Sequence, residues 1–360
     1  MAYTTIDDPS QYFQTVLYSG NGSTQSITND GNSDLQPDWL WFKNRNDTQV
    51  HQLFDTSRGI ANSLRSNSTD AENTDDPNDR LTAINSDGFS LGADGNPNNG
   101  SNTYVCWQWK CNGGTTTTND ASATGVGNQD STHQANTTSG FSIITYSPPS
   151  NQVGTMAHGL GAVPHVMIVK CRSTNGERWE VYHHKNTSAP ETDHLGLSET
   201  DATVDSTHTW NDTAPTSTIF TVGSSGALNE VSKTYVAYLF TEIQGYSKFG
   251  KYEGNGSANG PFINTGFKPA WVMIKRTDSS NSWTIRDSKR STFNVMQKSL
   301  FADLTNAEAD SSNYDFDFLS NGFKQRNANG IDNANGGTYV YLAFAEYPFV
   351  SSKGVPITAR

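Results

Sequence analysis

The sequence contains few cysteines and few apolar residues. Its three cysteines, Cys106, Cys111 and Cys171, are odd in number and few, so a disulfide framework is not expected and they indicate free thiols in a protein made in a reducing compartment. Apolar residues make up only 33% of the chain, but aromatic residues make up 11%. Disordered chains are poor in aromatic residues. This composition therefore favours a loop-rich all-β protein whose cores are filled by Trp, Tyr and Phe.

Positive charge is scarce as well, because 24 Lys and Arg residues stand against 36 Asp and Glu residues and the formal net charge is −12. Nucleic-acid binders gain most of their affinity from basic residues that contact phosphates, so no nucleic-acid partner is expected. No apolar run approaches 18 residues, and no membrane insertion is expected either. The opening MAYTTIDDPS is polar and acidic, unlike a signal peptide.

Three sequence features recur in the same order along the chain. They are a tyrosine followed by a polar turn, an apolar stretch that follows a proline and ends in lysine, and a second apolar stretch that begins Thr-Tyr-Val. Because their spacings agree within a few residues, an internal repeat is predicted. The anchors are the turn tyrosines Tyr18, Tyr146 and Tyr252, the prolines Pro37, Pro164 and Pro269, the lysines Lys43, Lys170 and Lys275, and the tyrosines Tyr104, Tyr235 and Tyr339.

These anchors divide the chain into units of about 100 residues. Short apolar stretches bounded by Gly, Asn, Asp and Pro are typical of strands and turns. The predicted fold is therefore all-β, with three tandem jelly-roll-like β-sandwich repeats. Residues 112–139 lack Phe, Tyr and Trp and are expected to form a Thr-, Asn- and Gly-rich linker or a surface insertion. The expected parts are an N-terminal arm (1–13), three repeats (14–111, 140–245 and 246–350) and a C-terminal tail (351–360).

Several longer motifs resemble those of a known family. YSGNGS, PDWLWFKNR, LFDTSRG, NSDGFSLG and GPFINTGFKPAWVMIKRTD are similar to motifs of structural proteins of tailed phages that are frequent in marine phage and prophage genomes. Members of that family are described as concanavalin A-like lectin/glucanase-type domains of unknown function. The resemblance covers nearly the whole chain. It implies concanavalin A-like sandwiches in a virion protein made in the host bacterial cytoplasm, and it brings no established activity or functional residues.

The sequence lacks the carboxylate pattern of an enzyme of this type. Concanavalin A-like glucanases carry E-x-D-x-x-E, in which paired carboxylates act as nucleophile and acid/base. The nearest pair here, Asp315 and Asp317 in NYDFDFL, has no accompanying Glu. We therefore expect no enzymatic activity, no catalytic residue and no cofactor.

No metal site is predicted. The oxygen-rich stretches 74–79 and 93–101 depart from the EF-hand pattern, and ordinary turn chemistry explains their composition, although binding of Ca²⁺ in one of these loops stays open. Zinc sites need three or four ligands with a defined spacing, and the adjacent His183 and His184 do not provide them.

An Asp-x-x-Arg pattern occurs twice, at Asp55 with Arg58 and at Asp287 with Arg290. Aspartate side chains cap turns, and carboxylates form strong pairs with guanidinium groups. The pattern therefore predicts two structural turns in which each arginine pairs with its own aspartate or with a neighbouring carbonyl.

Exposed aromatic rings are the expected binding groups, because they stack on sugar rings. Trp179, Tyr182, Trp210 and Trp283 fall outside the recurring stretches and are the candidate glycan-binding residues.

The N-terminal arm is the candidate assembly element. Tyr3, Ile6, Tyr12 and Phe13 make it more apolar than a solvated terminus needs to be. Ordering a residue costs roughly 1–2 kcal/mol of backbone entropy, which burial of such side chains can offset. We expect the arm to pack on a partner chain, either another copy in a trimer or another virion protein.

These observations predict a non-enzymatic virion structural protein that is exposed on the particle as a tail-fibre, tail-associated or head-fibre component. It would contact the host surface or its glycans, and multivalent display would strengthen weak single contacts. A capsid or tail decoration protein without an external ligand is the alternative. A glycan-cleaving enzyme is disfavoured by the missing carboxylates.

Overall fold

The computed structural model describes residues 2–74, 80–93 and 95–356. The fold is all-β, as predicted, and is built from antiparallel sheets with only short helical turns. In the described residues, no helix has the length and apolar character needed to cross a membrane. The strands of these described residues form three larger and three smaller sheets, and each larger sheet faces a smaller one whose strands are interleaved with its own along the chain.

Sheet 1 comes from the first third of the chain and has the strand order β1-β7-β3-β4. Its small partner sheet has the order β2-β6-β5. The strands are β1 (Phe13–Ser19), β2 (Gln25–Ile27), β3 (Trp39–Asn44), β4 (Gln52–Asp55), β5 (Leu81–Ile84), β6 (Phe89–Leu91) and β7 (Thr103–Trp109), and the helix is α1 (Gly95–Asn98).

Sheet 2 has more strands than sheets 1 and 3, in the order β15-β14-β13-β12-β17-β10-β9-β8, and it faces the pair β11-β16. Residues 112–139, for which a linker or insertion is expected, contribute β8 and β9 to this sheet. The elements are β8 (Thr117–Asn119), α2 (Ala121–Thr124), β9 (Ser131–Asn136), β10 (Phe141–Tyr146), β11 (Gly154–Ala157), β12 (Val166–Cys171), β13 (Glu180–His183), β14 (Asp193–Gly196), β15 (Val204–Asp205), α3 (Thr207–Trp210), β16 (Ile219–Val222) and β17 (Tyr235–Phe240).

Sheet 3 has the order β18-β26-β20-β21-β22-β23 and faces β19-β25-β24. The last strand, β26, pairs along most of its length with β20. The elements are β18 (Ser247–Glu253), β19 (Phe262–Asn264), β20 (Phe267–Arg276), β21 (Thr284–Asp287), β22 (Lys298–Phe301), β23 (Ala309–Asp310), β24 (Phe316–Leu319), β25 (Gly322–Gln325), α4 (Gly330–Asn333) and β26 (Thr338–Pro348).

The three main sheets share one strand order and one register. In each of them the strand that carries the turn tyrosine (β1, β10 or β18) pairs with the Thr-Tyr-Val strand, which pairs in turn with the strand that carries the recurring lysine. The recurring tyrosines stack in pairs across the first two of these strands. The register pairs are Lys43 with Val105, Lys170 with Val236 and Lys275 with Val340, and the stacked rings are Tyr18 with Tyr104 (5.2 Å), Tyr146 with Tyr235 (5.1 Å) and Tyr252 with Tyr339 (4.9 Å). Residues of different main sheets that occupy the same position in this shared register are called equivalent.

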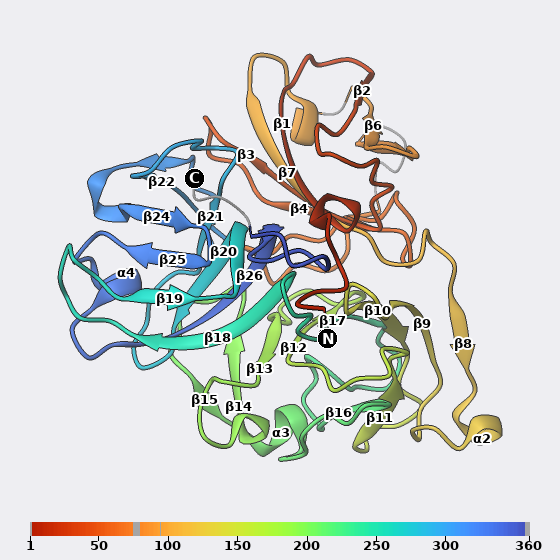
Figure 1. The fold of residues 1–360 in the computed structure, drawn as a ribbon. Coiled ribbons are helices and arrows are strands. Elements are labelled where there is room, and N and C mark those ends of the chain that lie inside the picture. Colours follow the sequence, from red (N-terminus) through yellow and green to blue (C-terminus); the bar gives the residue numbers. More distant parts are fainter. Residues whose placement is uncertain (1, 75–79, 94, 357–360) are drawn as a thin grey trace.

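The main sheets meet face to face in a common aromatic core. Side chains alternate between the two faces of a strand, and in β7 the rings of Trp107 and Trp109 point to the centre while Tyr104 points to the small sheet. Trp271 and Tyr238 bring sheets 3 and 2 into the same cluster. Figure 1 shows the three main sheets around this centre, with the small sheets on the outside. Both faces of each main sheet are therefore buried.

Candidate functional site

The recurring lysines join neighbouring sheets. Each lies at the end of a buried strand and donates hydrogen bonds to backbone carbonyls, one of which belongs to a loop of the preceding sheet. Burial disfavours the ammonium charge and lowers the pKa of all three lysines to about 8. The acceptors are the carbonyls of Thr305 for Lys43 (3.2 Å), Thr69 for Lys170 (3.4 Å) and Thr200 for Lys275 (2.9 Å).

Both Asp-x-x-Arg turns form as predicted. Asp55 accepts from the backbone amide of Arg58 at 2.8 Å and pairs with its guanidinium group. Asp287 accepts from the backbone amide of Arg290 at 2.8 Å and from its Nε at 2.5 Å. Both ion pairs are buried, so they are structural elements of the interior.

Each of these aspartates also binds the neighbouring sheet. Tyr238 Oη of sheet 2 donates to Asp55 at 2.6 Å, and Trp107 Nε1 of sheet 1 donates to Asp287 at 3.0 Å. The equivalent position in sheet 2 is His183, whose Nε2 donates to the carbonyl of Tyr341 in sheet 3 at 3.2 Å. The three contacts thus run from sheet to sheet around the core.

The places where two neighbouring main sheets are joined by these contacts are called junctions. A glutamate completes two of the three junctions. Glu72 accepts from Arg58 and, at 2.8 Å, from Arg172, and Glu308 accepts equivalently from Arg290 and Arg45. Burial raises the pKa of Glu72 and Glu308, but the arginine contacts outweigh it and hold both pKa values below the ordinary range. These two junctions are therefore ionic.

The third junction is neutral. Thr203 stands in the place of the glutamates, and its Oγ1 donates to Asn186 Oδ1 at 2.7 Å. Asn186 lies three residues after His183, as the arginines lie three residues after the aspartates. The backbone amide of Thr203 donates to the carbonyl of Thr277 of sheet 3 at 2.9 Å, so the path of the chain is the same as at the ionic junctions.

The four aromatic residues expected to face glycans are buried. Trp179 Nε1 donates to the carbonyl of Arg65 at 2.9 Å, and Trp283 Nε1 donates to that of Gly196 at 2.8 Å, so both rings fill junctions between sheets. Trp210 Nε1 donates to the carbonyl of Asp193. Tyr182 packs edge-on against Trp210. No face of these rings is open to a sugar, so the expectation that the four side chains are exposed is wrong. They lie outside the recurring strands, but they pack against neighbouring residues in the interior.

The four apolar residues of the arm contact their own chain. Tyr3 Oη donates to the carbonyl of Gly266 at 2.5 Å, and Ile6 is buried. The ring of Tyr12 lies 6.0 Å from that of Tyr246, and Phe13, in β1, stacks on Phe344 at 5.5 Å. These contacts supply, within the chain, the burial that a partner chain was expected to supply.

The remaining polar candidates lie in ordinary structural contacts. Asp315 accepts from Gln297 Nε2 at 2.8 Å, and Asp317 lies 3.4 Å from Arg326. Of the oxygen-rich stretches, residues 75–79 and 94 fall outside the described residues. In the described ranges, no group of three or more His, Cys, Asp or Glu side chains is placed to hold a metal ion.

A cleft of about 390 Å³ lies where sheet 3 meets sheet 1. Phe13, Gln14 and Thr15 of β1 line one side, and the ends of β20 and β26 line the other. Two ion pairs border it, Lys268 with Glu346 and Lys289 with Asp30, both at 2.9 Å.

Two buried polar atoms in this cleft have no hydrogen-bond partner. They are Oγ1 of Thr15, a residue that is 4% exposed, and Oε2 of Glu346. Buried polar atoms are nearly always satisfied by protein, water or ligand. Both oxygens are fully buried behind the residues that line the cleft, so a group placed in the cleft does not reach them.

A family model described as a domain of unknown function (DUF7483) matches residues 8–348. The chain belongs to this family. The DUF7483 match begins just before β1 and ends at the last residue of β26, so it spans all three main sheets. No curated protein and no solved structure matches the chain.

Sequence reasoning missed the cleft within this DUF7483 chain. Its residues belong to no motif, because Thr15 and Glu346 come from opposite ends of the chain. One signal was available. The residue after the recurring proline is Asp38 in sheet 1, His165 in sheet 2 and Ala270 in sheet 3. Ala270 therefore marks sheet 3 as the one that lacks a polar side chain at this position.

Proposed function

We propose that the protein is a non-enzymatic structural protein of a phage virion, exposed on the particle, where it contacts the host surface or its glycans. One observation carries the proposal: the side chains that recur along the chain are used to lock three similar sheets to one another. We infer that each main sheet and its small partner sheet form one copy of a sandwich unit. Such a closed arrangement suits a protein that must keep its shape while exposed on a particle.

The motif resemblance to tailed-phage structural proteins supports the virion location. The chemistry of the interior supports a non-enzymatic role, since the buried carboxylates Asp55, Asp287, Glu72 and Glu308 all bind arginines of the junctions. Partners would be other virion proteins and a host glycan. The trimer expected from the sequence stays a prediction.

A decoration protein of the capsid or tail is the second candidate. Three similar units around one centre give a single chain three similar outer surfaces (Figure 1). Symmetric lattices place identical surfaces around local symmetry axes, so such a chain suits a local three-fold position.

The test uses particles purified from the organism that encodes the chain. We expect mass spectrometry to find the chain in the particles and gold-labelled antibodies to bind fibres or tails of intact particles. Fab fragments are expected to slow adsorption to host cells. A regular label over the head, with adsorption unchanged, would favour the decoration role, and absence of the chain from particles would contradict both.

A further inference from the structure

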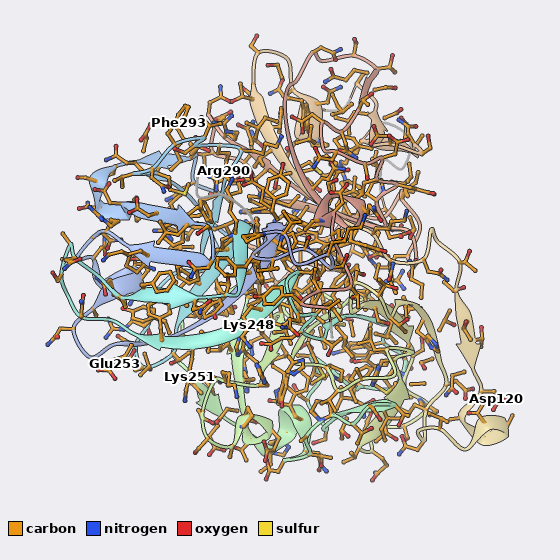
Figure 2. The ribbon with its side chains drawn as sticks, in the orientation of Figure 1. Asp120, Lys248, Lys251, Glu253, Arg290 and Phe293 are labelled. Atoms are coloured by element: carbon orange, nitrogen blue, oxygen red, sulfur yellow. The ribbon has the colours of Figure 1, made fainter. Side chains whose placement is uncertain are left out.

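Phe293 is the most exposed of the large apolar side chains in the described residues, with 78% of its surface open to solvent. It lies in the loop between β21 and β22, three residues after Arg290, and Figure 2 shows it at the outer edge of the molecule. In sheet 1 the corresponding loop turns an apolar residue inward, because Ile60, two residues after Arg58, packs against the core between sheet 1 and its small partner sheet. Sheet 3 therefore presents an aromatic ring that the described residues leave uncovered.

The loop holds Phe293 in a fixed place. Asn294, the next residue, donates to the carbonyl of Phe318 at 2.7 Å and accepts from its amide at 3.0 Å, so the loop is fastened to β24. On the other side of the ring, Arg290 is anchored in its buried pair with Asp287. A group that is already ordered loses less conformational entropy when it binds. The loop is therefore preorganised for a contact.

The cleft between sheets 3 and 1 opens beside this ring. Thr292, the residue before Phe293, lines the cleft and is exposed, as are residues 30–32 on the side of sheet 1. These exposed residues mark the mouth of the cleft. Among the other lining residues, Ala270 and Tyr347 are partly exposed and give the cleft accessible apolar surface.

The cleft has room for a phenyl ring. Its volume is about 390 Å³, and a cavity of about 150 Å³ is enough to bind benzene. The ring of Phe293 does not fill the cleft of its own chain, because it is exposed to solvent. An unfilled pocket and an uncovered ring therefore lie next to each other on one surface.

We propose that two copies of the chain pair about a two-fold axis, each inserting Phe293 into the cleft of the other. In a two-fold interface the same patch is used on both subunits, so it must be complementary to itself. A patch that holds both the ring and the pocket meets this condition, because the rotation places each ring opposite the pocket of the second copy. The mouth is self-complementary in charge as well, since Lys289 and Asp30 lie 2.9 Å apart with side chains 41% and 62% exposed, and each can face the opposite charge on the second copy.

The size of the contact sets its strength. Two buried phenylalanine rings account for roughly 300–500 Å², whereas a specific interface buries about 1,200 Å² or more. The remaining area comes from the polar rim, so we expect a reversible dimer whose population depends on concentration. This contact is separate from the trimer expected from the sequence, and the inference does not depend on the proposed function.

The test is sedimentation velocity of the full chain over a series of concentrations, which should show a reversible equilibrium between monomer and dimer. Phe293→Ala removes the exposed ring, and Ala270→Phe fills the cleft. Each is expected to raise the dissociation constant of the dimer by about tenfold or more. A mixture of the two variants should dimerise more tightly than either variant alone, because the ring of the Ala270→Phe copy can enter the intact cleft of the Phe293→Ala copy.

Phe262→Ala is the matched control, because Phe262 is another exposed phenylalanine, in β19, and it does not line the cleft. It should leave the dissociation constant unchanged, and circular dichroism should show the same fold in all variants. Phe293→Ala alters an exposed residue and decides the question by itself if Ala270→Phe does not fold. A monomer at every concentration, a trimer in place of the dimer, a dimer unaffected by Phe293→Ala, or a mixture that dimerises no better than its folded components would overturn the inference.

Discussion

Arg58→Met is expected to lower the free energy of unfolding by about 3–5 kcal/mol. The substitution leaves the carboxylates of Asp55 and Glu72 without their shared guanidinium partner, and the side chain of Asp55 is completely buried. Removing one member of a buried ion pair is costly because the remaining charge stays desolvated. Urea unfolding followed by tryptophan fluorescence measures the effect.

Three further variants make the comparison specific. Arg290→Met breaks the equivalent ionic junction and should cost about as much. Asn186→Ala, at the neutral junction, removes one hydrogen bond and should cost about 1 kcal/mol. Arg65→Met breaks only the partly exposed pair with Asp70 and should cost less than about 1 kcal/mol. If Arg58→Met proved as mild as Arg65→Met, the buried junctions would not stabilise the fold in the way described.

Acidification from pH 6.5 to about 4 is expected to destabilise the protein steeply. Burial lowers the pKa of His158, His165 and His194 to about 4 and that of His183 to about 3, against an ordinary value of 6.5. The unfolded chain therefore binds protons in this range that the folded chain does not. Their contribution is fully present above pH 6.5 and is lost as the pH falls through the folded pKa values.

The size of this effect follows from the number of groups. Each such histidine adds a slope of up to about 1.4 kcal/mol per pH unit. Burial raises the pKa of Glu242, but the nearby His184 imidazole (3.7 Å) and the hydrogen bonds from Lys248 and the amide of Phe249 outweigh it and lower the pKa to about 2. This carboxylate extends the loss of stability from pH 4.5 downward.

His183→Asn provides the control for the pH dependence. An asparagine amide can donate to the carbonyl of Tyr341 and accept from the amide of Lys185, as the imidazole does, but it does not titrate. The slope of unfolding free energy between pH 6.5 and 4 should fall by up to about 1.4 kcal/mol per pH unit. An unchanged slope would show that His183 is not held neutral in the interior.

Local patterns of the sequence predicted the fold class well. Short apolar strands, bounded by Gly, Asn and Pro, are recognisable over a few residues, and the lysine and tyrosine anchors fall at shared register positions. The Asp-x-x-Arg turns were predictable for the same reason, since Asp55 and Asp287 bind groups three residues away.

Contacts between sheets could not be predicted from local patterns. Trp179 and Trp283 donate to backbone carbonyls that lie 114 and 87 residues away along the chain, so nothing in their own surroundings indicated burial. Residues 112–139 lack aromatic side chains, yet β9 is ordered because β10 offers it an open edge to pair with. The open cleft depends on Thr15 and Glu346, which the closing of the chain brings together.

The central claim is that three similar sheets share one core and form one interlocked body. Differential scanning calorimetry of the full chain near pH 7 tests it most directly, because a single cooperative body unfolds with a van't Hoff enthalpy equal to the calorimetric enthalpy. We predict one transition with a ratio of about 1 between the two enthalpies. Resolved successive transitions, or a van't Hoff enthalpy near a third of the calorimetric one, would show that the sheets unfold independently and would contradict the claim.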